Sequence, residues 1–103
     1  MSVLAEFAMF PTDKGESVSK YVSRIIKMID ESGFSYKLTP MGTVIETKSV
    51  KEALGIIEIA YKELEEDCNR VYSTIKLDIR KGKDNRLTGK ISSIEEKIGK
   101  VKK

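Results

Sequence analysis

The chain has 103 residues, of which 40% are hydrophobic and 34% charged, and its net charge is +3. This length suits a single domain, 1–103, with one core, and the composition is typical of a soluble protein. No apolar run approaches the roughly 18 residues of a membrane span, and Glu6 interrupts the first apolar stretch, which argues against a signal peptide. We therefore expect a cytoplasmic protein without a membrane partner.

The chain contains no histidine and a single cysteine, Cys68. Ser-His and Cys-His nucleophilic pairs, Cys/His zinc sites and an internal disulfide are therefore excluded. Cys68 lies late in a helical pattern, which favours a structural thiol over a nucleophile. The glycines form neither a dinucleotide-binding fingerprint nor a phosphate loop. These observations favour a protein without catalysis, metal or cofactor.

The first predicted element is a strand over 3–10, apolar on both faces as in a central strand. Glu6 is its exception, and a carboxylate in a strand covered on both sides needs a partner. A helix follows, because apolar residues recur at helical spacing up to Gly33, which is suited to a C-cap. The spacing Asp13-x-x-Glu16 predicts the N-cap of this helix.

Two short strands and a second helix are predicted next. Residues 34–38 and 43–47 alternate in polarity around a turn, as expected of a hairpin. Ser49-x-x-Glu52 predicts a capping box at the start of the helix. Gly55 inside this helix costs about 1 kcal/mol relative to alanine, which suggests a close approach to a neighbouring element.

The most regular stretch is 70–80, a predicted strand with strict alternation. One face, expected to lie on the core, carries Val71, Ser73, Ile75, Leu77 and Ile79. The other face carries Tyr72, Thr74, Lys76, Asp78 and Arg80. A short charged helix is expected last, with apolar residues at Leu87, Ile91, Ile94 and Ile98. A basic tail with Lys100, Lys102 and Lys103 follows it.

The predicted order is strand, helix, strand, strand, helix, strand, plus a C-terminal helix. This order indicates an α+β, ferredoxin-like βαββαβ domain with an antiparallel sheet in the order 4-1-3-2. Two helices would cover one face and leave the other open. Apolar residues expected on this open face are Leu4, Ala8 and Phe10. Such a face predicts association between subunits, with Glu6 enclosed and Lys76 or Thr74 as its nearest partner.

Several interpretations of the polar residues remain open. Glu6, Glu46, Lys76 and Asp78 could form cross-strand ion pairs worth a few tenths of a kcal/mol each. They could instead line a pocket for a small polar or cationic ligand between packed sheets. Two carboxylates could support acid/base chemistry, but no nucleophile accompanies them. RNA binding is disfavoured because 43–47 carries no aromatic residue for base stacking.

Four segments together resemble one known family. They are the first strand ending in Phe10-Pro11, then Gly33, then 40–46 (Pro-Met-Gly-Thr-Val-Ile-Glu), and finally 70–80. The combination resembles the thiamine-binding protein family, the UPF0045 group, which is related to YkoF-type thiamine/hydroxymethylpyrimidine-binding domains. The resemblance implies a ferredoxin-like subunit, assembly into dimers and tetramers through sheet edges and faces, and binding of thiamine or its pyrimidine precursor. It implies no known reaction.

We select as candidate ligand-binding residues Glu6, Thr43, Glu46 and Lys76. The choice follows from the strand face on which each side chain is expected to lie and from its chemistry. A carboxylate or hydroxyl pair suits the ring nitrogens and amine of an aminopyrimidine, and a buried Glu would favour the positive thiazolium. We expect a homo-oligomer, a tetramer first and a dimer second, with a small-molecule ligand near a subunit interface and no nucleic acid. The alternative is a structural or regulatory homo-oligomer with an incidental pocket.

Overall fold

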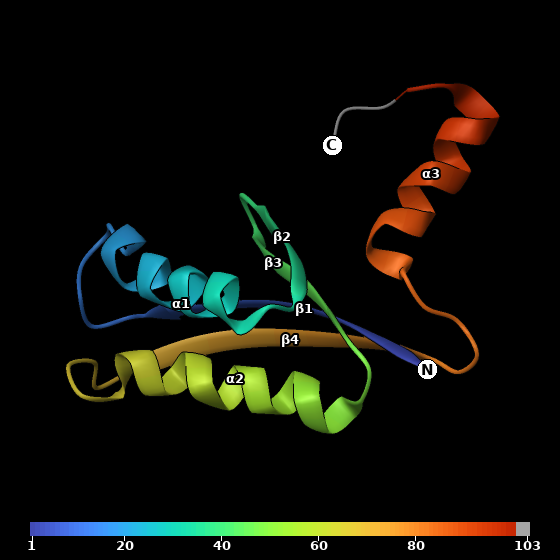
Figure 1. Cartoon of the computed structure of the whole chain (residues 1–103). Coiled ribbons are helices and arrows are strands. Elements are labelled where there is room, and N and C mark those ends of the chain that lie inside the picture. Colours follow the sequence, from blue (N-terminus) through green and yellow to red (C-terminus); the bar gives the residue numbers. More distant parts are fainter. Residues whose placement is uncertain (101–103) are drawn as a thin grey trace.

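The computed structural model describes residues 1–100, and the side chains of all of these except 88–92. Seven elements follow one another along the chain (Figure 1): β1 (Ser2–Pro11), α1 (Ser19–Ser32), β2 (Ser35–Thr39), β3 (Gly42–Thr47), α2 (Val50–Glu65), β4 (Val71–Arg80) and α3 (Arg86–Ile98). The predicted α+β class and order of elements are confirmed. The predicted side chain of Ile91 and the tail residues Lys102 and Lys103 lie outside the described part.

The four strands form one antiparallel sheet in the order β2-β3-β1-β4, which is 4-1-3-2 when counted from the other edge. β1 pairs with β4 over its whole length, from Ser2 opposite Arg80 to Pro11 opposite Val71. β3 pairs with β1 only over 3–7. The part of β1 beyond residue 7 therefore has a neighbouring strand on one side only.

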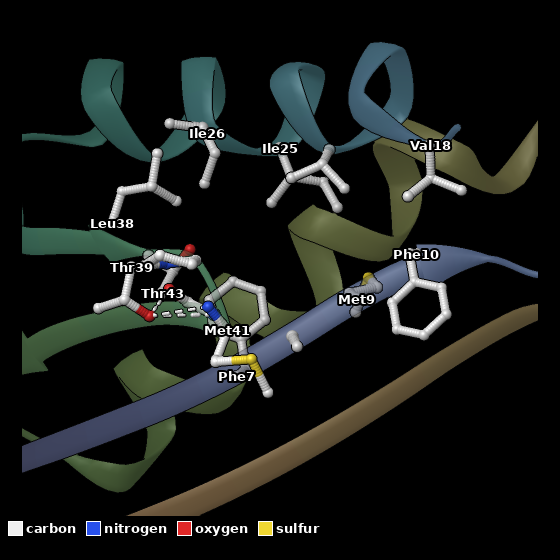
Figure 2. Close-up of a pocket in the computed structure, with 14 residues that line it drawn as sticks. Phe7, Met9, Phe10, Val18, Ile25, Ile26, Leu38, Thr39, Met41 and Thr43 are labelled. Atoms are coloured by element: carbon white, nitrogen blue, oxygen red, sulfur yellow. Dashed lines mark hydrogen bonds between the residues drawn. The ribbon is translucent and has the colours of Figure 1, made fainter. Parts of the chain in front are cut away.

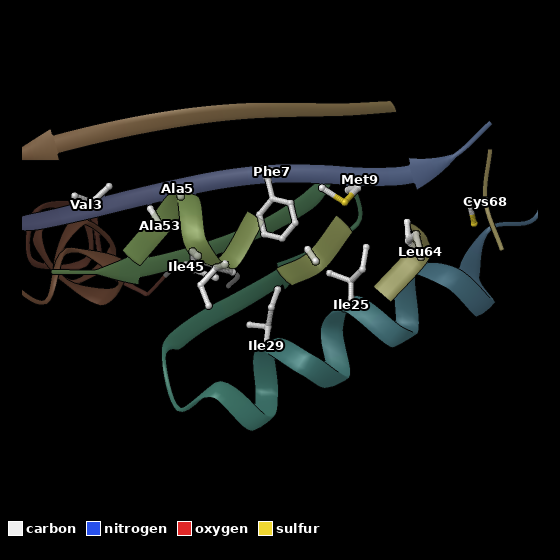
Figure 3. Packing of buried hydrophobic residues seen from close by; sticks show 12 residues of the cluster. Val3, Ala5, Phe7, Met9, Ile25, Ile29, Ile45, Ala53, Leu64 and Cys68 are labelled. Atoms are coloured by element: carbon white, nitrogen blue, oxygen red, sulfur yellow. The ribbon is translucent and has the colours of Figure 1, made fainter. Parts of the chain in front are cut away.

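The hydrophobic core lies between the sheet and the helices α1 and α2 (Figure 3). Its buried residues are Val3, Ala5, Phe7, Met9, Ile25, Ile29, Ile45, Ala53, Ile56, Ala60, Leu64 and Cys68. The alternate residues Val3, Ala5, Phe7 and Met9 of β1 all belong to this set, which follows from the two-residue repeat of a strand. No helix in the described part of the chain is long and apolar enough to cross a membrane.

β4 departs from its prediction in how much of it is buried. Its apolar face does point to the side of the helices, because Phe7 of the core pairs with Ile75. However, Ile75, Leu77 and Ile79 are 43%, 36% and 50% exposed. The expectation that this whole face lies on the core is therefore wrong for its second half. The reason is that β4 is an edge strand and α2 packs chiefly over its neighbour β1.

The start of α1 was predicted wrongly. The helix begins at Ser19, and its N-cap residue Val18 gives no side-chain hydrogen bond. The Asp13 carboxylate instead accepts a hydrogen bond from the Asn69 backbone N–H at 2.8 Å. Asp13 therefore ties the segment after β1 to the loop before β4, a contact between distant parts of the chain that a local capping pattern does not reveal.

The other predicted caps are confirmed. Ser49 Oγ accepts a hydrogen bond from the Glu52 N–H at 3.1 Å, and the Glu52 carboxylate accepts one from the Lys48 N–H at 2.9 Å. Gly33 ends α1 in the left-handed conformation, with a φ of 84°. These local hydrogen bonds satisfy backbone groups that a helix end leaves free.

Gly55 does not approach a neighbour, so that expectation was wrong. A Cβ atom added at Gly55 would meet nothing within 4 Å, whereas one added at Gly42 would lie 2.9 Å from the Phe7 carbonyl oxygen. The close approach that requires glycine is therefore in the β2–β3 turn, where Gly42 packs against the backbone of β1.

We expect Gly55→Ala to raise the free energy of unfolding by about 0.5–1 kcal/mol, because alanine has less backbone freedom to lose in a helix. Gly33→Ala makes the same chemical change at a positive φ and should lower it instead. Urea unfolding of both variants measures the two effects. A less stable Gly55→Ala variant would show that Gly55 has a packing role after all.

Candidate functional site

A pocket of about 300 Å³ lies between α1 and the part of β1 that β3 does not reach (Figure 2). The turn between β2 and β3 closes one end. The lining residues are Phe7, Ala8, Met9, Phe10, Val18, Val22, Ile25, Ile26, Leu38, Thr39, Pro40, Met41, Gly42 and Thr43. None of them is charged. The pocket therefore suits a small, flat and largely apolar group with a few polar atoms.

The β2–β3 turn is held in place by the side chain of Thr39. Its hydroxyl donates to the Gly42 carbonyl at 2.9 Å and accepts the N–H groups of Met41 and Gly42 at 3.2 and 3.1 Å. Gly42 in turn packs against β1. The hydrogen-bonded β2–β3 turn therefore forms a fixed wall at this end of the pocket. Met41 projects from this turn and is 87% exposed.

Thr43 is the predicted site residue that lines this pocket. It is 4% exposed, and it pairs with Phe7 on the face covered by the helices. Its hydroxyl makes no hydrogen bond to another residue in the described part of the chain, whereas the hydroxyl of Thr47 donates to the Ser49 carbonyl at 2.9 Å. Thr43 therefore has an unused hydroxyl beside an apolar cavity.

Glu6 and Lys76 lie on the opposite face of the sheet, directly across from each other on β1 and β4. Lys76 Nζ is 3.7 Å from Glu6 Oε1, and the two side chains are 83% and 48% exposed. The predicted partnership is confirmed, but this chain alone does not enclose Glu6. An exposed pair of this kind contributes about 0–1 kcal/mol to stability.

Glu46 anchors the last helix. Its carboxylate accepts hydrogen bonds from Ser2 Oγ at 2.6 Å and from the backbone N–H groups of Arg86 and Leu87, both at 3.0 Å. The N-cap residue of α3, Asn85, makes no side-chain capping bond. Glu46 therefore supplies from β3 the acceptor that the start of α3 lacks locally.

Arg86 completes this anchor. Its side chain is almost fully buried. Nε donates to Ser2 Oγ at 3.2 Å, Nη2 donates to the Ser2 carbonyl at 2.7 Å, and Nη1 lies 3.1 Å from Asp78 Oδ2. The paired guanidinium fixes α3 to both β1 and β4. The open face is thus partly covered by α3, an arrangement that the sequence pattern did not indicate.

The pKa of Glu46 reflects these contacts. Burial alone would raise this pKa, but the hydrogen bonds from Ser2 and from the N–H groups of Arg86 and Leu87 outweigh it, together with the Arg86 charge. The pKa therefore lies below its ordinary value, and Glu46 is ionised in the folded protein at neutral pH.

The four predicted site residues do not form one constellation. Thr43 faces the helices, whereas Glu6, Glu46 and Lys76 face the other way. The alternation of β3 already placed Thr43 and Glu46 on opposite faces, and that signal was available in the sequence. The pocket wall formed by α1 and the free part of β1 was not predicted from the sequence. This wall depends on β1 being longer than β3, and such a difference in strand length leaves no local sequence pattern.

Cys68 is buried at the end of the core. Burial raises the pKa of its thiol, and the neighbouring Asp67 carboxylate raises it further. A raised pKa keeps the thiol protonated and weakly nucleophilic, which agrees with the structural role predicted for it.

Comparison with known proteins gives consistent matches along nearly the whole chain. A family model described as "Thiamine-binding protein" matches residues 5–95. A UPF0045 protein of Methanocaldococcus jannaschii is 36% identical over 94 residues, which cover 91% of this chain and 93% of that protein. A UPF0045 protein of Mycobacterium tuberculosis is 32% identical over 95 residues, 92% of this chain and 93% of the relative.

Solved structures match as well. The crystal structure of the Methanocaldococcus jannaschii protein has a TM-score of 0.81, covering 92% of this chain and 97% of that one. A Thermotoga maritima protein described as a candidate for thiamine biosynthesis or salvage has a TM-score of 0.78 at 19% identity, covering 91% and 99%. At that identity the second likeness shows the fold alone.

We expect Glu46→Gln to lower the free energy of unfolding by roughly 1–3 kcal/mol at neutral pH, because charge-assisted hydrogen bonds at the start of α3 are lost. The lowered pKa means that this contribution is present above the ordinary value of 4.5 and is lost as the pH falls through the lower folded value. The gap between variant and natural chain should therefore narrow in acid.

Urea unfolding between pH 7 and pH 3 measures this gap. Glu58→Gln is the matched control, since Glu58 forms an exposed pair with Lys62 on α2 at 3.7 Å, and it should change stability little at any pH. Equal stability of Glu46→Gln and the natural chain at pH 7 would contradict the anchoring role.

Proposed function

The chain belongs to the thiamine-binding protein family, and on that premise we propose that it binds thiamine or its hydroxymethylpyrimidine precursor in the pocket between α1 and β1. The observation that carries the proposal is the unused Thr43 hydroxyl beside an uncharged cavity of about 300 Å³. This volume lies at the lower end of the range for small-molecule sites. A single pyrimidine ring with short substituents suits such a space.

The pyrimidine is the part of the ligand that this pocket favours. Its ring is flat, so the side chains of Val22, Ile25 and Phe7 can contact its faces, and its nitrogen atoms offer acceptors to the Thr43 hydroxyl. The thiazolium ring of thiamine carries a positive charge and would extend out of the uncharged cavity toward solvent or a second subunit. Thr43 is therefore the residue that we assign to ligand contact.

The remaining sequence candidates receive different roles in this proposal. Glu6 and Lys76 lie on the opposite face of the sheet from this pocket, so neither contacts the pyrimidine in this proposal, and both become part of the subunit interface when a second subunit packs on the open face. Glu46 acts indirectly, by holding α3 against that face. Binding without catalysis is proposed because the chain has no histidine and its one thiol is buried.

We also propose that this ferredoxin-like chain works as a homo-oligomer in a cytoplasmic pool. β4 is a ten-residue edge strand, and its Ile75, Leu77 and Ile79 are exposed. Antiparallel pairing of two β4 strands about Leu77 would set Ile75 opposite Ile79 and Lys76 opposite Asp78. Apolar side chains would then face apolar ones, and opposite charges would face each other. Two such dimers packed through their open faces would give a tetramer, the assembly that we favour over a dimer.

We expect thiamine or hydroxymethylpyrimidine to bind with saturable heat in isothermal titration calorimetry and to raise the melting temperature. Thr43→Val should weaken binding about 2- to 12-fold, the value of one neutral hydrogen bond of about 0.5–1.5 kcal/mol. Thr47→Val is the matched control: it removes a buried hydroxyl from the same face of β3 and should lower stability without changing affinity.

The alternative function is a structural or regulatory oligomer whose pocket is incidental. Absence of both heat and thermal shift with either compound at millimolar concentration would favour that alternative over ligand binding.

We expect light scattering at micromolar concentration to give a mass several times the 11.6 kDa of one chain. Leu77→Lys should reduce this mass, because it would place two like charges at the centre of the paired β4 strands. Ile59→Lys is the control, since Ile59 is similarly exposed but lies on α2 in the groove facing α1. A stable monomer of the natural chain would contradict the assembly.

A further inference from the structure

The free edge of β1 offers hydrogen-bonding groups that the fold itself does not use. β1 pairs with β4 up to Pro11, but its pairing with β3 stops at Phe7. Backbone N–H and C=O groups of successive strand residues point alternately to the two neighbouring strands. Beyond Phe7, every second residue of β1 therefore directs its backbone groups to a side where no strand lies.

Two contacts identify which residues these are. The Thr12 N–H donates to the Arg70 carbonyl at 2.8 Å, so the even-numbered residues at this end of β1 direct their backbone groups toward β4. The Phe7 carbonyl oxygen lies 2.9 Å from where a Cβ of Gly42 would be, so the odd-numbered residues face β3. Met9 is the next odd-numbered residue, and it lies past the end of β3.

The pocket lies on this free edge. Four consecutive residues of β1, 7–10, line it, which side chains alone do not explain because they alternate between the two faces. Figure 2 shows α1 above this part of β1 and the β2–β3 turn at its end, with Met9 between Phe7 and Phe10. The Met9 N–H and C=O thus face the same cavity as Thr43.

Because of Pro11, Met9 is the residue of this free edge that offers both a backbone N–H and a backbone C=O group. Pro11 is the next odd-numbered residue after Met9, and proline has no backbone N–H. Met9 therefore presents one donor and one acceptor, side by side, in a cavity whose lining is otherwise mostly apolar. Buried backbone groups of this kind require a partner.

We propose that the pocket recognises a 4-aminopyrimidine through the backbone of Met9. This proposal rests on the proposed function and explains how the same pocket would select its ligand. The Met9 N–H donates to a ring nitrogen, and the adjacent exocyclic amine donates to the Met9 carbonyl. The heterocycle takes the place that a continued β3 would occupy, because antiparallel strands exchange the same pair of hydrogen bonds.

This arrangement predicts which heterocycles are rejected. A ring carbonyl in place of the amine reverses the order of donor and acceptor, so the same pose would set acceptor against acceptor. The apolar lining offers no substitute partner, and unpaired buried polar groups are strongly disfavoured. Selection between amino and oxo pyrimidines is therefore a property of the main chain and not of a charged side chain.

Amide hydrogen exchange measured by NMR tests the contact without altering the protein. In the free protein the Met9 amide should exchange faster than those of Ala8 and Phe10, whose N–H groups face β4. Saturation with thiamine should slow Met9 exchange about tenfold or more, to the level of these two neighbours. Ala8 and Phe10 report any general stabilisation by the ligand.

A ligand pair supplies the second measurement. Oxythiamine, with a ring carbonyl in place of the 4-amino group, has the size and thiazolium charge of thiamine and should bind at least about tenfold more weakly. Equal affinity of the two compounds, or thiamine binding that leaves Met9 exchange unchanged, would overturn this inference and leave the proposed function standing. Absence of binding by thiamine and hydroxymethylpyrimidine would overturn both.

Discussion

The difference in length between β1 and β3 is the constraint on which the candidate site depends. β1 has ten residues paired with β4, while β3 covers only the first part of its other edge. Helix α1 crosses the uncovered part and the Thr39-held turn closes its end. The sheet therefore ends in a cavity with apolar walls and a backbone edge, and no inserted loop is needed to form it.

A second constraint acts at the opposite end of the sheet. Glu46 and the buried residues Ser2 and Arg86 form a polar cluster in which each group has a partner, as low-dielectric surroundings require. The cluster fixes α3 over part of the open face, so only the remainder, with the Glu6–Lys76 pair, is available for a second subunit. The proposed ligand pocket and the open face proposed for assembly thus lie on opposite faces of one sheet.

Much of the fold could be predicted from the sequence because it depends on local repeats. Strand alternation, the Ser49 capping box and the Gly33 C-cap are properties of neighbouring residues, and the structure contains all three. The failures concern distant contacts. Asp13 binds the loop before β4, and Gly55 has open space around it. The anchoring role of Glu46 could not be predicted for the same reason: it was singled out as a ligand group, and its hydrogen-bond partners Ser2, Arg86 and Leu87 lie 40 to 44 residues away in the chain.

The central claim is that the ligand occupies the pocket between α1 and β1, and methyl NMR during a thiamine titration tests it most directly. The account predicts saturable shifts at Val22, Ile25 and Leu38, which line the pocket, and little change at Leu4 and Val44 on the open face. Shifts confined to Leu4 and Val44 would contradict it.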